Sequence, residues 1–251
     1  MTLRNRVAIV TGGGRGIGAV FAAGLAREGA SVLVVDLDEA GAKDVAARIR
    51  EAGGVAQPFR ADVSDPESTK AMAKAAVDAF GGIDILLNNA AMYANLKRRA
   101  FNELSPEEFD RVLAVNVKGP WLTTLAVFPA MRERGKGKII NVSSSSIFIA
   151  TNRLAHYVSS KMGVIGLTRA LARELGDYNI CVNVIIPGMT DSTSNSAITP
   201  PERHAEEARA RSIKRVQVPD DLVGTAVFLA SDRSDFVTGQ SLVVDGGRYF
   251  D

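Results

Sequence analysis

The sequence is poor in the residues that make covalent cross-links and metal sites. Its 251 residues include a single cysteine, Cys181, and only two histidines. One cysteine excludes an intrachain disulfide, and so small a set of thiol and imidazole ligands argues against a bound metal ion. We therefore expect a protein of a reducing compartment that works without a metal.

Long apolar runs and blocks of one charge are also missing. No stretch is apolar over the length that a bilayer requires, and Met1–Arg6 leads into a short apolar run without the features of a signal peptide. The 30 basic and 28 acidic residues nearly cancel, and no basic block stands out. These features predict a soluble, cytoplasmic protein without nucleic-acid or membrane partners.

What the chain does contain is an alternation of short apolar runs with amphipathic helical patterns, which is typical of a parallel sheet covered on both faces. The predicted strands are Val7–Val10, Ser31–Asp36, Ala56–Arg60, Ile83–Asn88, Lys138–Val142, Ile180–Ile186 and Ser241–Val244. The predicted helices are Ile17–Glu28, Asp38–Ala52, Pro66–Phe80, Pro106–Arg134, Ala155–Gly176 and Pro219–Ala230. This pattern predicts an α/β fold, a doubly wound, Rossmann-like sheet of seven parallel strands in an α/β/α sandwich.

The length and the 46% hydrophobic content fit one domain over residues 1–251. The long fourth helix should bend near Gly119-Pro120, because proline removes an amide donor inside a helix. Pro187–Val216 is the one long irregular stretch, with a helical pattern around Pro201–Arg211. A loop of this length in a compact domain is usually a lid or a binding loop, so we expect it to cover a substrate.

A glycine-rich segment, Thr11–Gly18, joins the first predicted strand to the first helix. Gly12, Gly16 and Gly18 allow a tight turn and close backbone approach, and the helix N-terminus supplies amide donors and partial positive charge for a phosphate. Their spacing differs from the usual G-x-G-x-x-G pattern, and a plain tight turn is the alternative. The strand before and the helix after favour a nucleotide site.

Asp36 ends the second predicted strand, eighteen residues after Gly18. An acid at this place can accept hydrogen bonds from the adenosine ribose hydroxyls of a dinucleotide. The alternative is a helix N-cap for residues 38–52, a role that Asp38 can fill instead.

Tyr157 and Lys161 lie four residues apart on a predicted helix, so their side chains share a face. A cation beside a tyrosine favours phenolate, and lowering a pKa of about 10 by about three units needs about 4 kcal/mol. Ser144 follows a predicted strand and should lie at the ligand-binding edge of the sheet. Taken alone, a Tyr-x-x-x-Lys pair is common on helix surfaces and the serine run 143–146 can be an ordinary polar loop.

Together these residues make the chain resemble the short-chain dehydrogenase/reductase family, in its single-domain form, over nearly the whole sequence. Thr11–Gly18 is similar to the family's T-G-x-x-x-G-x-G, Asp62-Val63 to its adenine-contacting pair, and Val244–Gly247 to its C-terminal signature. Asn88–Ala91 resembles the N-N-A-G element. The resemblance implies cofactor contacts by Gly12, Arg15, Gly16, Ile17, Gly18, Asp36, Asp62, Val63, Asn89, Ala90, Tyr157, Lys161, Pro187, Gly188 and Thr190.

The sequence departs from the family pattern at two places. Ala91 replaces a glycine, and its methyl group is expected to crowd the cofactor slightly. In the loop beside the nicotinamide, Thr190 replaces a branched apolar residue and Ser192 a threonine. A hydroxyl remains at both loop positions, so we expect the carboxamide contacts to persist.

The resemblance also implies a catalytic set of Asn116, Ser144, Tyr157 and Lys161. Tyr157 would exchange a proton with the substrate oxygen, Lys161 would lower the tyrosine pKa and hold the nicotinamide ribose, and Ser144 would hydrogen-bond the reacting oxygen. Asn116 would position a water in a proton path through Lys161, or satisfy backbone groups at a helix kink. Ser143 and Ser145 remain alternatives to Ser144.

Three functions fit the sequence. The favoured one is an NAD-dependent dehydrogenase that interconverts a secondary alcohol and a ketone, with NADP less favoured because of Asp36. The second is an NADPH-dependent reductase of the 3-oxoacyl type, which Arg15 supports because it can face a ribose phosphate. The third is a nucleotide-sensing regulator without catalysis, against which the intact Ser144, Tyr157 and Lys161 argue.

The substrate pocket should be built from residues 92–99, 145–156 and 189–216. Apolar residues beside the serine, Ile147-Phe148-Ile149, suggest an alkyl or aromatic group next to the carbonyl. The basic residues Lys97, Arg98, Arg99 and Arg153 form either a solvated face or a carboxylate clamp. By resemblance we also expect a homotetramer, in which the tail 248–251 reaches a neighbouring subunit.

Overall fold

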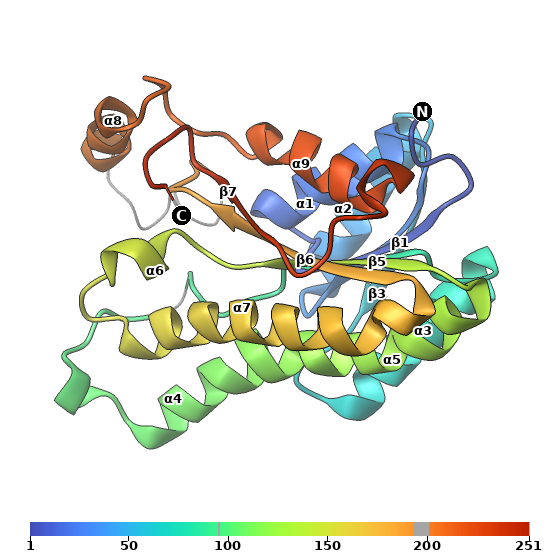
Figure 1. The fold of residues 1–251 in the computed structure, drawn as a ribbon, viewed down its shortest axis with the longest axis horizontal. Coiled ribbons are helices and arrows are strands. Elements are labelled where there is room, and N and C mark those ends of the chain that lie inside the picture. Colours follow the sequence, from blue (N-terminus) through green and yellow to red (C-terminus); the bar gives the residue numbers. More distant parts are fainter. Residues whose placement is uncertain (95, 193–200, 251) are drawn as a thin grey trace.

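The chain forms a single parallel sheet between two layers of helices, as a computed structural model shows (Figure 1). The structure describes residues 1–94, 96–192 and 201–250, and within them the sheet has seven strands in the order β3-β2-β1-β4-β5-β6-β7. The strands are β1 (Val7–Thr11), β2 (Ser31–Asp36), β3 (Val55–Arg60), β4 (Ile85–Asn88), β5 (Gly137–Val142), β6 (Ile180–Pro187) and β7 (Ser241–Val244). The predicted doubly wound α/β fold is confirmed.

Helices cover both faces of the sheet (Figure 1). On one face lie α1 (Gly16–Arg27), α2 (Glu39–Glu51) and α9 (Asp220–Ala230), and on the other α3 (Pro66–Phe80), α4 (Pro106–Leu113), α5 (Gly119–Arg134) and α7 (Ala155–Leu175). The short α6 (Ser146–Ile149) and α8 (Pro201–Ala210) lie beyond the carboxyl ends of the strands.

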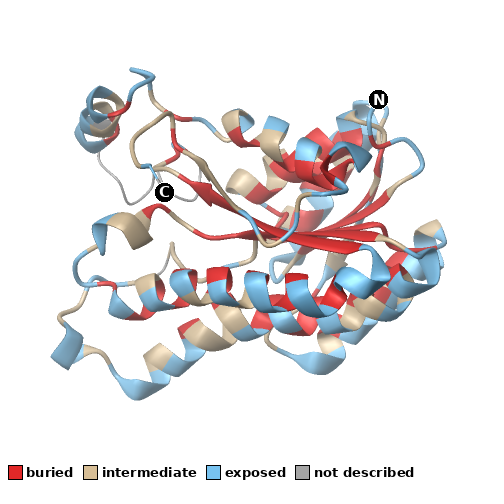
Figure 2. Ribbon diagram, in the orientation of Figure 1, coloured by how far each residue is buried: buried red, intermediate tan, exposed pale blue. Residues whose placement is uncertain are grey.

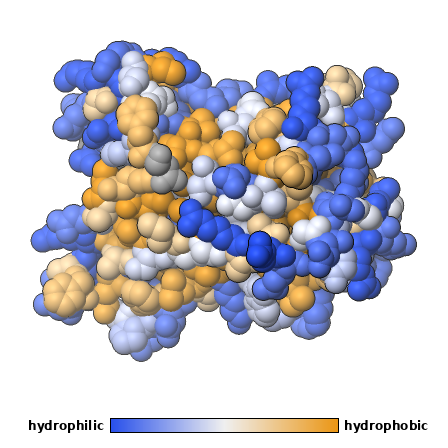
Figure 3. All heavy atoms as spheres, in the orientation of Figure 1, coloured by the Kyte–Doolittle hydropathy of each residue, from blue (hydrophilic) through white to orange (hydrophobic). Residues whose placement is uncertain are grey.

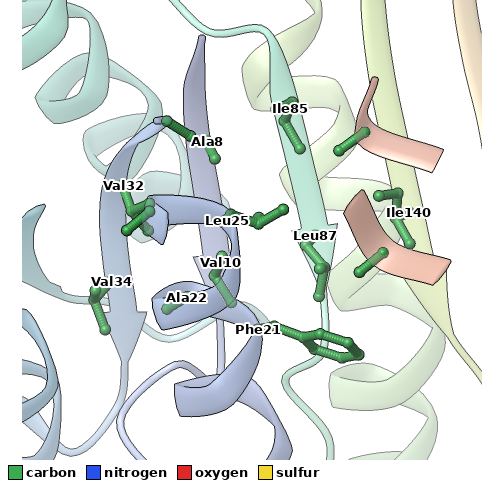
Figure 4. Packing of buried hydrophobic residues seen from close by; sticks show 14 of the residues in the cluster. Ala8, Val10, Phe21, Ala22, Leu25, Val32, Val34, Ile85, Leu87 and Ile140 are labelled. Carbon is green, nitrogen blue, oxygen red and sulfur yellow. The ribbon is translucent and has the colours of Figure 1, made fainter. Parts of the chain in front are cut away.

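Alternation along the strands divides the core between the two faces. In β1, Ala8 and Val10 pack with Phe21 and Leu25 of α1, whereas Ile9 packs in the cluster on the opposite face (Figure 4). Successive side chains of a strand point to opposite faces, so a fully apolar run is needed when helices cover both. Figure 2 accordingly shows the sheet as the most deeply buried part of the molecule.

The sheet reverses its winding at β1, which pairs with β2 on one side and β4 on the other. In a doubly wound sheet the crevice at this switch, beyond the carboxyl ends of the strands, is where ligands bind. The loops that follow β1, β2, β4, β5 and β6 therefore converge on one place, and these loops hold most of the predicted site residues.

The predicted helix over 106–134 is interrupted. A π-helical turn, Ala114–Lys118, separates α4 from α5, slightly before the bend expected at Gly119-Pro120. Helical backbone continues from Leu113 through Gly119, and Pro120 has no amide donor for the preceding turn, so the hydrogen-bond irregularity falls in that turn. Other predicted boundaries differ from the observed ones by one or two residues, and α8 confirms the helical pattern around 201–211.

The rest of the substrate-loop prediction falls partly outside the described residues, because 193–200 are not described. Among the helices of the described chain, none has the length and apolarity to cross a membrane. No cluster of potential metal ligands occurs in the described part either.

Candidate active site

A cleft of about 620 Å³ lies at the carboxyl ends of the strands, within the size range of small-molecule and cofactor sites. Its walls bring together residues from the whole length of the chain. The predicted site residues that line it are Gly12, Arg15, Ile17, Gly18, Asp36, Asp62, Val63, Asn89, Ala90, Ser144, Tyr157, Lys161, Pro187, Gly188 and Thr190. Gly16 and Asn116 are the two predicted residues that do not line it.

Hydrogen bonds tie the glycine-rich turn to the loop after β4. The Thr11 hydroxyl accepts bonds from the backbone N–H groups of Asn89 and Ala90, both at 3.2 Å. The Asn89 amide donates in return to the carbonyls of Thr11 (3.3 Å) and Gly12 (3.0 Å). These bonds hold the two loops together at the switch point of the sheet, where they form the base of the cleft.

Close packing between these two loops requires glycine at positions 12 and 18. A Cβ atom on Gly12, whose φ is +62°, would lie 2.8 Å from the Ala90 Cα, and one on Gly18 would overlap the Gly12 carbonyl oxygen. The N-terminus of α1 follows directly, and Arg15 at its N-cap makes no side-chain capping bond. First-turn amide groups of a helix beside an open cleft form an anion site, so the turn fits the phosphates of a dinucleotide.

Replacing Gly18 with alanine is expected to weaken cofactor binding at least tenfold and to destabilise the fold by about 1–3 kcal/mol, because the methyl group forces the turn apart. Cofactor titration by fluorescence and chemical denaturation measure the two effects. The matched control is Gly166→Ala in α7, where an added Cβ meets no atom within 4 Å. Equal cofactor affinity in the Gly18 variant and the control would contradict this view of the turn.

Asp36 is held at the end of β2 by two backbone amides. Its carboxylate accepts from Gly14 N–H (2.9 Å) and Asp38 N–H (3.0 Å), and it lines the cleft half-buried. The alternative role as the cap of α2 is wrong, because Asp38 is the N-cap and accepts from Gly41 N–H. A carboxylate has about four lone-pair positions, so Asp36 keeps acceptor capacity for ribose hydroxyls.

The next two predicted contacts, Asp62 and Val63, follow β3 on the same side of the cleft. Asp62 accepts from both the backbone N–H (2.8 Å) and the hydroxyl (2.6 Å) of Ser64, which fixes the loop. Exposed Leu37 also lines the cleft here and offers an apolar surface beside Asp36. The Asp36 carboxylate can bind ribose hydroxyls, and the apolar side chains of Leu37 and Val63 can contact an adenine ring, so this part of the cleft fits an adenosine.

Tyr157 is buried near the start of α7 and faces the cleft. Its ring lies 4.8 Å from the ring of Tyr93, at an interplanar angle of 44°. Burial raises the pKa of the Tyr157 phenol well above its usual value, and a hydrogen bond with Ser144 only partly offsets this. The lowered pKa expected from the sequence is therefore not observed in the protein by itself.

Lys161 lies beside the Tyr157 ring but makes no direct bond to the phenol. Its ammonium lies 5.7 Å from the centroid of the Tyr157 ring and donates to the carbonyl of Val142 at 2.9 Å, so it stands beside the phenol rather than bonded to it. Burial lowers the pKa of Lys161 itself to about 8. Desolvation of the phenol is therefore the largest influence on the pKa of Tyr157 in the protein alone.

Ser144 is the serine of the run that meets the tyrosine. The hydroxyl of Ser143 is committed elsewhere, because it donates to the backbone carbonyl of Lys161 at 2.7 Å. Ser145 is buried and its backbone N–H donates to the Pro187 carbonyl. The Ser144 hydroxyl accepts from Ser146 N–H at 3.2 Å, and its interaction with Tyr157 acts to lower the pKa of the phenol, so Ser144 is the serine that acts on the predicted proton-exchanging residue.

Asn116 lies in the π-helical turn, away from the cleft wall. Its amide accepts from Met92 N–H (2.8 Å) and donates to the Met92 carbonyl (3.3 Å) and to the hydroxyl of Ser160 (3.0 Å). These bonds join the loop after β4 to α7, one residue from Lys161. The amide thus satisfies backbone groups at the helix irregularity, as one of the two interpretations expects.

The loop after β6 closes the cleft on the far side of Tyr157. A Cβ on Gly188 would lie 2.6 Å from the Gln217 side-chain oxygen, and buried Thr190 donates to the Gly188 carbonyl at 3.0 Å. The hydroxyl at position 190 is therefore present at the cleft wall, although turned toward the backbone. Ser192 lines the cleft as well.

The substrate end is lined mainly by apolar side chains, including Met92, Tyr93, Leu96, Ile149, Leu154 and Met189. Figure 3 shows apolar surface between α8 and α7, where α6 lies. Of the four basic residues considered, only Arg98 lines the cleft, whereas Arg99 pairs with Glu108 at 3.5 Å. Lys97, Arg99 and Arg153 are therefore not part of the cleft wall.

Several lining residues were missed by the sequence interpretation, Arg111 and Tyr249 among them. Arg111 reaches the cleft from α4, and Tyr249 reaches it from the C-terminal tail. Within this chain, Arg248 contacts Glu207 and Tyr249 stacks on Phe148, and the expected contact of the tail with a neighbouring subunit stays a prediction. The signal available in the sequence was Gly246-Gly247, whose φ values of +72° turn the chain back.

Comparison with known proteins agrees with this geometry. The family profile described as enoyl-(acyl carrier protein) reductase matches residues 12–248. An uncharacterized oxidoreductase of Mycobacterium tuberculosis (strain H37Rv) is 43% identical over 244 residues, 97% of each chain. Galactitol 2-dehydrogenase of Agrobacterium fabrum is 38% identical over 260 residues, 99% of each chain.

A solved structure has the same fold throughout. The crystal structure of a candidate NAD(P)-dependent gluconate 5-dehydrogenase from Beutenbergia cavernae, with NADP bound at low occupancy, is 38% identical and superposes with a TM-score of 0.90 over 98% of both chains. The family profile, the relatives and the shared fold agree with the glycine turn and the cleft. The chain is an oxidoreductase that belongs to the short-chain dehydrogenase/reductase family.

Proposed function

We propose that this single-domain chain is an NAD-dependent dehydrogenase that interconverts a small secondary alcohol and its ketone. The observation that supports this most directly is that Ser144, Tyr157 and Lys161, whose ammonium lies beside the Tyr157 ring, line the same cleft as the glycine turn and Asp36. An oxidised nicotinamide bound here would supply the hydride acceptor for the carbinol carbon and a positive charge.

The side chains would then divide the remaining work. Ser144 bonds the reacting oxygen, and Tyr157 takes the proton from the alcohol in oxidation and returns it to the carbonyl in reduction. The raised pKa of Tyr157 makes the phenol a stable proton donor in the protein alone. The Lys161 charge contributes to stabilising the phenolate that oxidation requires, and Asn116 holds α7 against the loop after β4.

The substrate class follows less directly from the cleft. The relatives named for galactitol and gluconate favour a polyhydroxylated alcohol. The apolar walls from Met92 to Met189 favour an alkyl or aromatic substituent beside the carbonyl. We propose a small alcohol with one apolar and one hydroxylated side, to be sought in a panel of sugar alcohols, hydroxy acids, and aryl and alicyclic alcohols.

The test is reduction of NAD by this panel, followed by absorbance, with the Tyr157→Phe protein as the blank. A Tyr157-dependent rate with at least one secondary alcohol is the expected result. The absence of any such rate in both directions, with NAD and with NADP, would contradict the proposal.

A second candidate is an NADPH-dependent carbonyl reductase of the 3-oxoacyl type. Arg15 lines the cleft and is exposed, so it is available to a ribose phosphate, and the related Beutenbergia protein holds NADP. Oxidation of NADPH by a 3-oxoacyl thioester, faster than any NAD-dependent oxidation, would favour this candidate.

We also expect a homotetramer. The exposed faces of α5 and α7 carry Trp121 (43% exposed), Leu125 (53%) and Met162 (52%), and β7 is an edge strand. Light scattering coupled to size exclusion should give four times the 26.6 kDa chain mass. A stable monomer at micromolar concentration would contradict this, and Trp121→Glu should shift the assembly toward smaller species.

A further inference from the structure

The C-terminal segment 245–250 folds back over the substrate end of its own cleft. Gly246 and Gly247, both at φ +72°, turn the chain directly after β7. The buried Asp245 carboxylate stabilises the turn by accepting from the N–H groups of Gly247 (2.9 Å), Arg248 (3.0 Å) and Tyr249 (2.9 Å). The turn is therefore a built element and not a frayed end.

The segment that joins α8 to α9 holds the returning chain. The Ser212 backbone N–H and hydroxyl both donate to the Gly247 carbonyl, at 3.1 and 3.0 Å, and Ile213 N–H donates to the Gly246 carbonyl at 2.9 Å. These bonds fix the position from which the next two side chains project.

Arg248 links the tail to α8. Its Nε lies 3.2 Å from the Glu207 carboxylate, and the side chains are 32% and 14% exposed, so the pair is partly shielded from water. The same guanidinium lies 4.8 Å from the centroid of the Tyr249 ring. Arg248 thus holds both the helix over the cleft and the tyrosine beside it.

Tyr249 links the tail to α6. Its ring stacks on Phe148 with a centroid distance of 5.6 Å and an interplanar angle of 28°. Phe148 follows Ser144 by four residues, and both Tyr249 and Glu207 line the cleft. A ring held by an aromatic and a cationic contact is a rigid wall, because tyrosine has only two side-chain torsions to fix.

The sheet order places this wall at the substrate end. Asp36 and Asp62 follow β2 and β3 at one side of the sheet, whereas Tyr249 follows β7 at the opposite edge, beyond the strand β5 that leads to Ser144. Tyr249 and the predicted adenosine contacts therefore lie on opposite sides of Ser144. The part of the substrate beyond the reacting carbon would lie on the Tyr249 side.

We propose that Tyr249 is a specificity-determining residue that contacts the substituent on the carbinol carbon and limits its length, and that Arg248, through Glu207, is its positioning residue. This inference rests on the proposed alcohol dehydrogenase function. A pocket wall that is off by one methylene group changes discrimination by about 10–200-fold, so removal of a whole ring should be visible in the specificity profile.

The test compares kcat and KM for a homologous series of secondary alcohols in Tyr249→Ala, Tyr249→Phe, Arg248→Gln and Arg248→Lys proteins. Phe250→Ala is the matched control, because Phe250 is the next residue of the tail and is exposed. In Tyr249→Ala, KM for the best wild-type substrate should rise about tenfold. The kcat/KM of the longest alcohols should increase at least about fivefold relative to the kcat/KM of that substrate. Tyr249→Phe should keep the length limit, because the ring remains.

Arg248→Gln should raise KM with little change in kcat, and Arg248→Lys should restore much of the loss because it keeps the charge beside Glu207. Cofactor affinity should stay within about twofold in all variants. An unchanged length profile in Tyr249→Ala would overturn the proposal, as would equal KM changes in Arg248→Gln and Phe250→Ala.

Failure of the proposed function is seen separately, as absence of Tyr157-dependent turnover in the wild-type protein, and it would overturn the substrate contact as well. The positioning role has its own readout. Hydrogen exchange of the α8 amides should be faster in Arg248→Gln than in Phe250→Ala, and equal exchange would overturn it.

Discussion

Replacing Tyr157 with phenylalanine is expected to lower turnover by 10²–10⁴-fold while leaving cofactor affinity within about twofold. The substitution removes one oxygen, to which we assign the proton exchange, and keeps the ring that packs against Tyr93. Steady-state kinetics and cofactor titration on the same preparation give the two quantities. Retention of more than about a tenth of the wild-type turnover would show that the general acid–base assignment is wrong.

Lys161→Ala serves as the comparison for this variant, because the lysine is expected to act on both properties. Its loss removes the buried cation beside the phenol and the group assigned to the nicotinamide ribose. Turnover and cofactor affinity should therefore fall together. A Lys161→Ala protein with normal cofactor affinity would limit the lysine to its electrostatic role.

The unmodified protein is expected to prefer NAD over NADP by a hundredfold or more in kcat/KM. Two backbone amides fix the Asp36 carboxylate at the cleft wall, so its charge cannot turn away from an added 2′-phosphate. Two unit charges about 5 Å apart at an effective dielectric of 20 repel by roughly 3 kcal/mol, and each 1.4 kcal/mol is about a factor of ten. One exposed arginine, Arg15, is too strongly screened to cancel this.

Asp36→Ala should raise kcat/KM for NADP, with Arg15 then free to pair with the phosphate. Asp36→Asn is the matched control, since it removes the charge and keeps an acceptor for the Gly14 amide. If the Asp36 charge causes the preference for NAD, both variants should lose most of it. If the position of the glycine turn causes it, only the alanine variant should lose it. Comparable kcat/KM for both cofactors in the unmodified protein would favour the reductase function instead.

The sequence by itself determined the layers of the fold and predicted the residues that gather at one end of the cleft. Fully apolar strands such as Val7–Val10 require helices on both faces, and a glycine turn followed by an acid one strand later places a dinucleotide at the switch point. These structures are determined by residues close together in the sequence. For this reason β1, α1, β2 and Asp36 all lie where the pattern predicted.

The contacts that favour Ser144 over its neighbours and the electrostatics of Tyr157 arise only from the tertiary structure. The Ser143 hydroxyl donates to a carbonyl eighteen residues away, and the phenol pKa is raised mainly by burial. The substrate end likewise depends on Tyr249, more than a hundred residues from Ser144, which the Gly246-Gly247 turn brings to Phe148. Desolvation and long-range contacts arise from the packing of distant segments, so a local sequence pattern does not contain them.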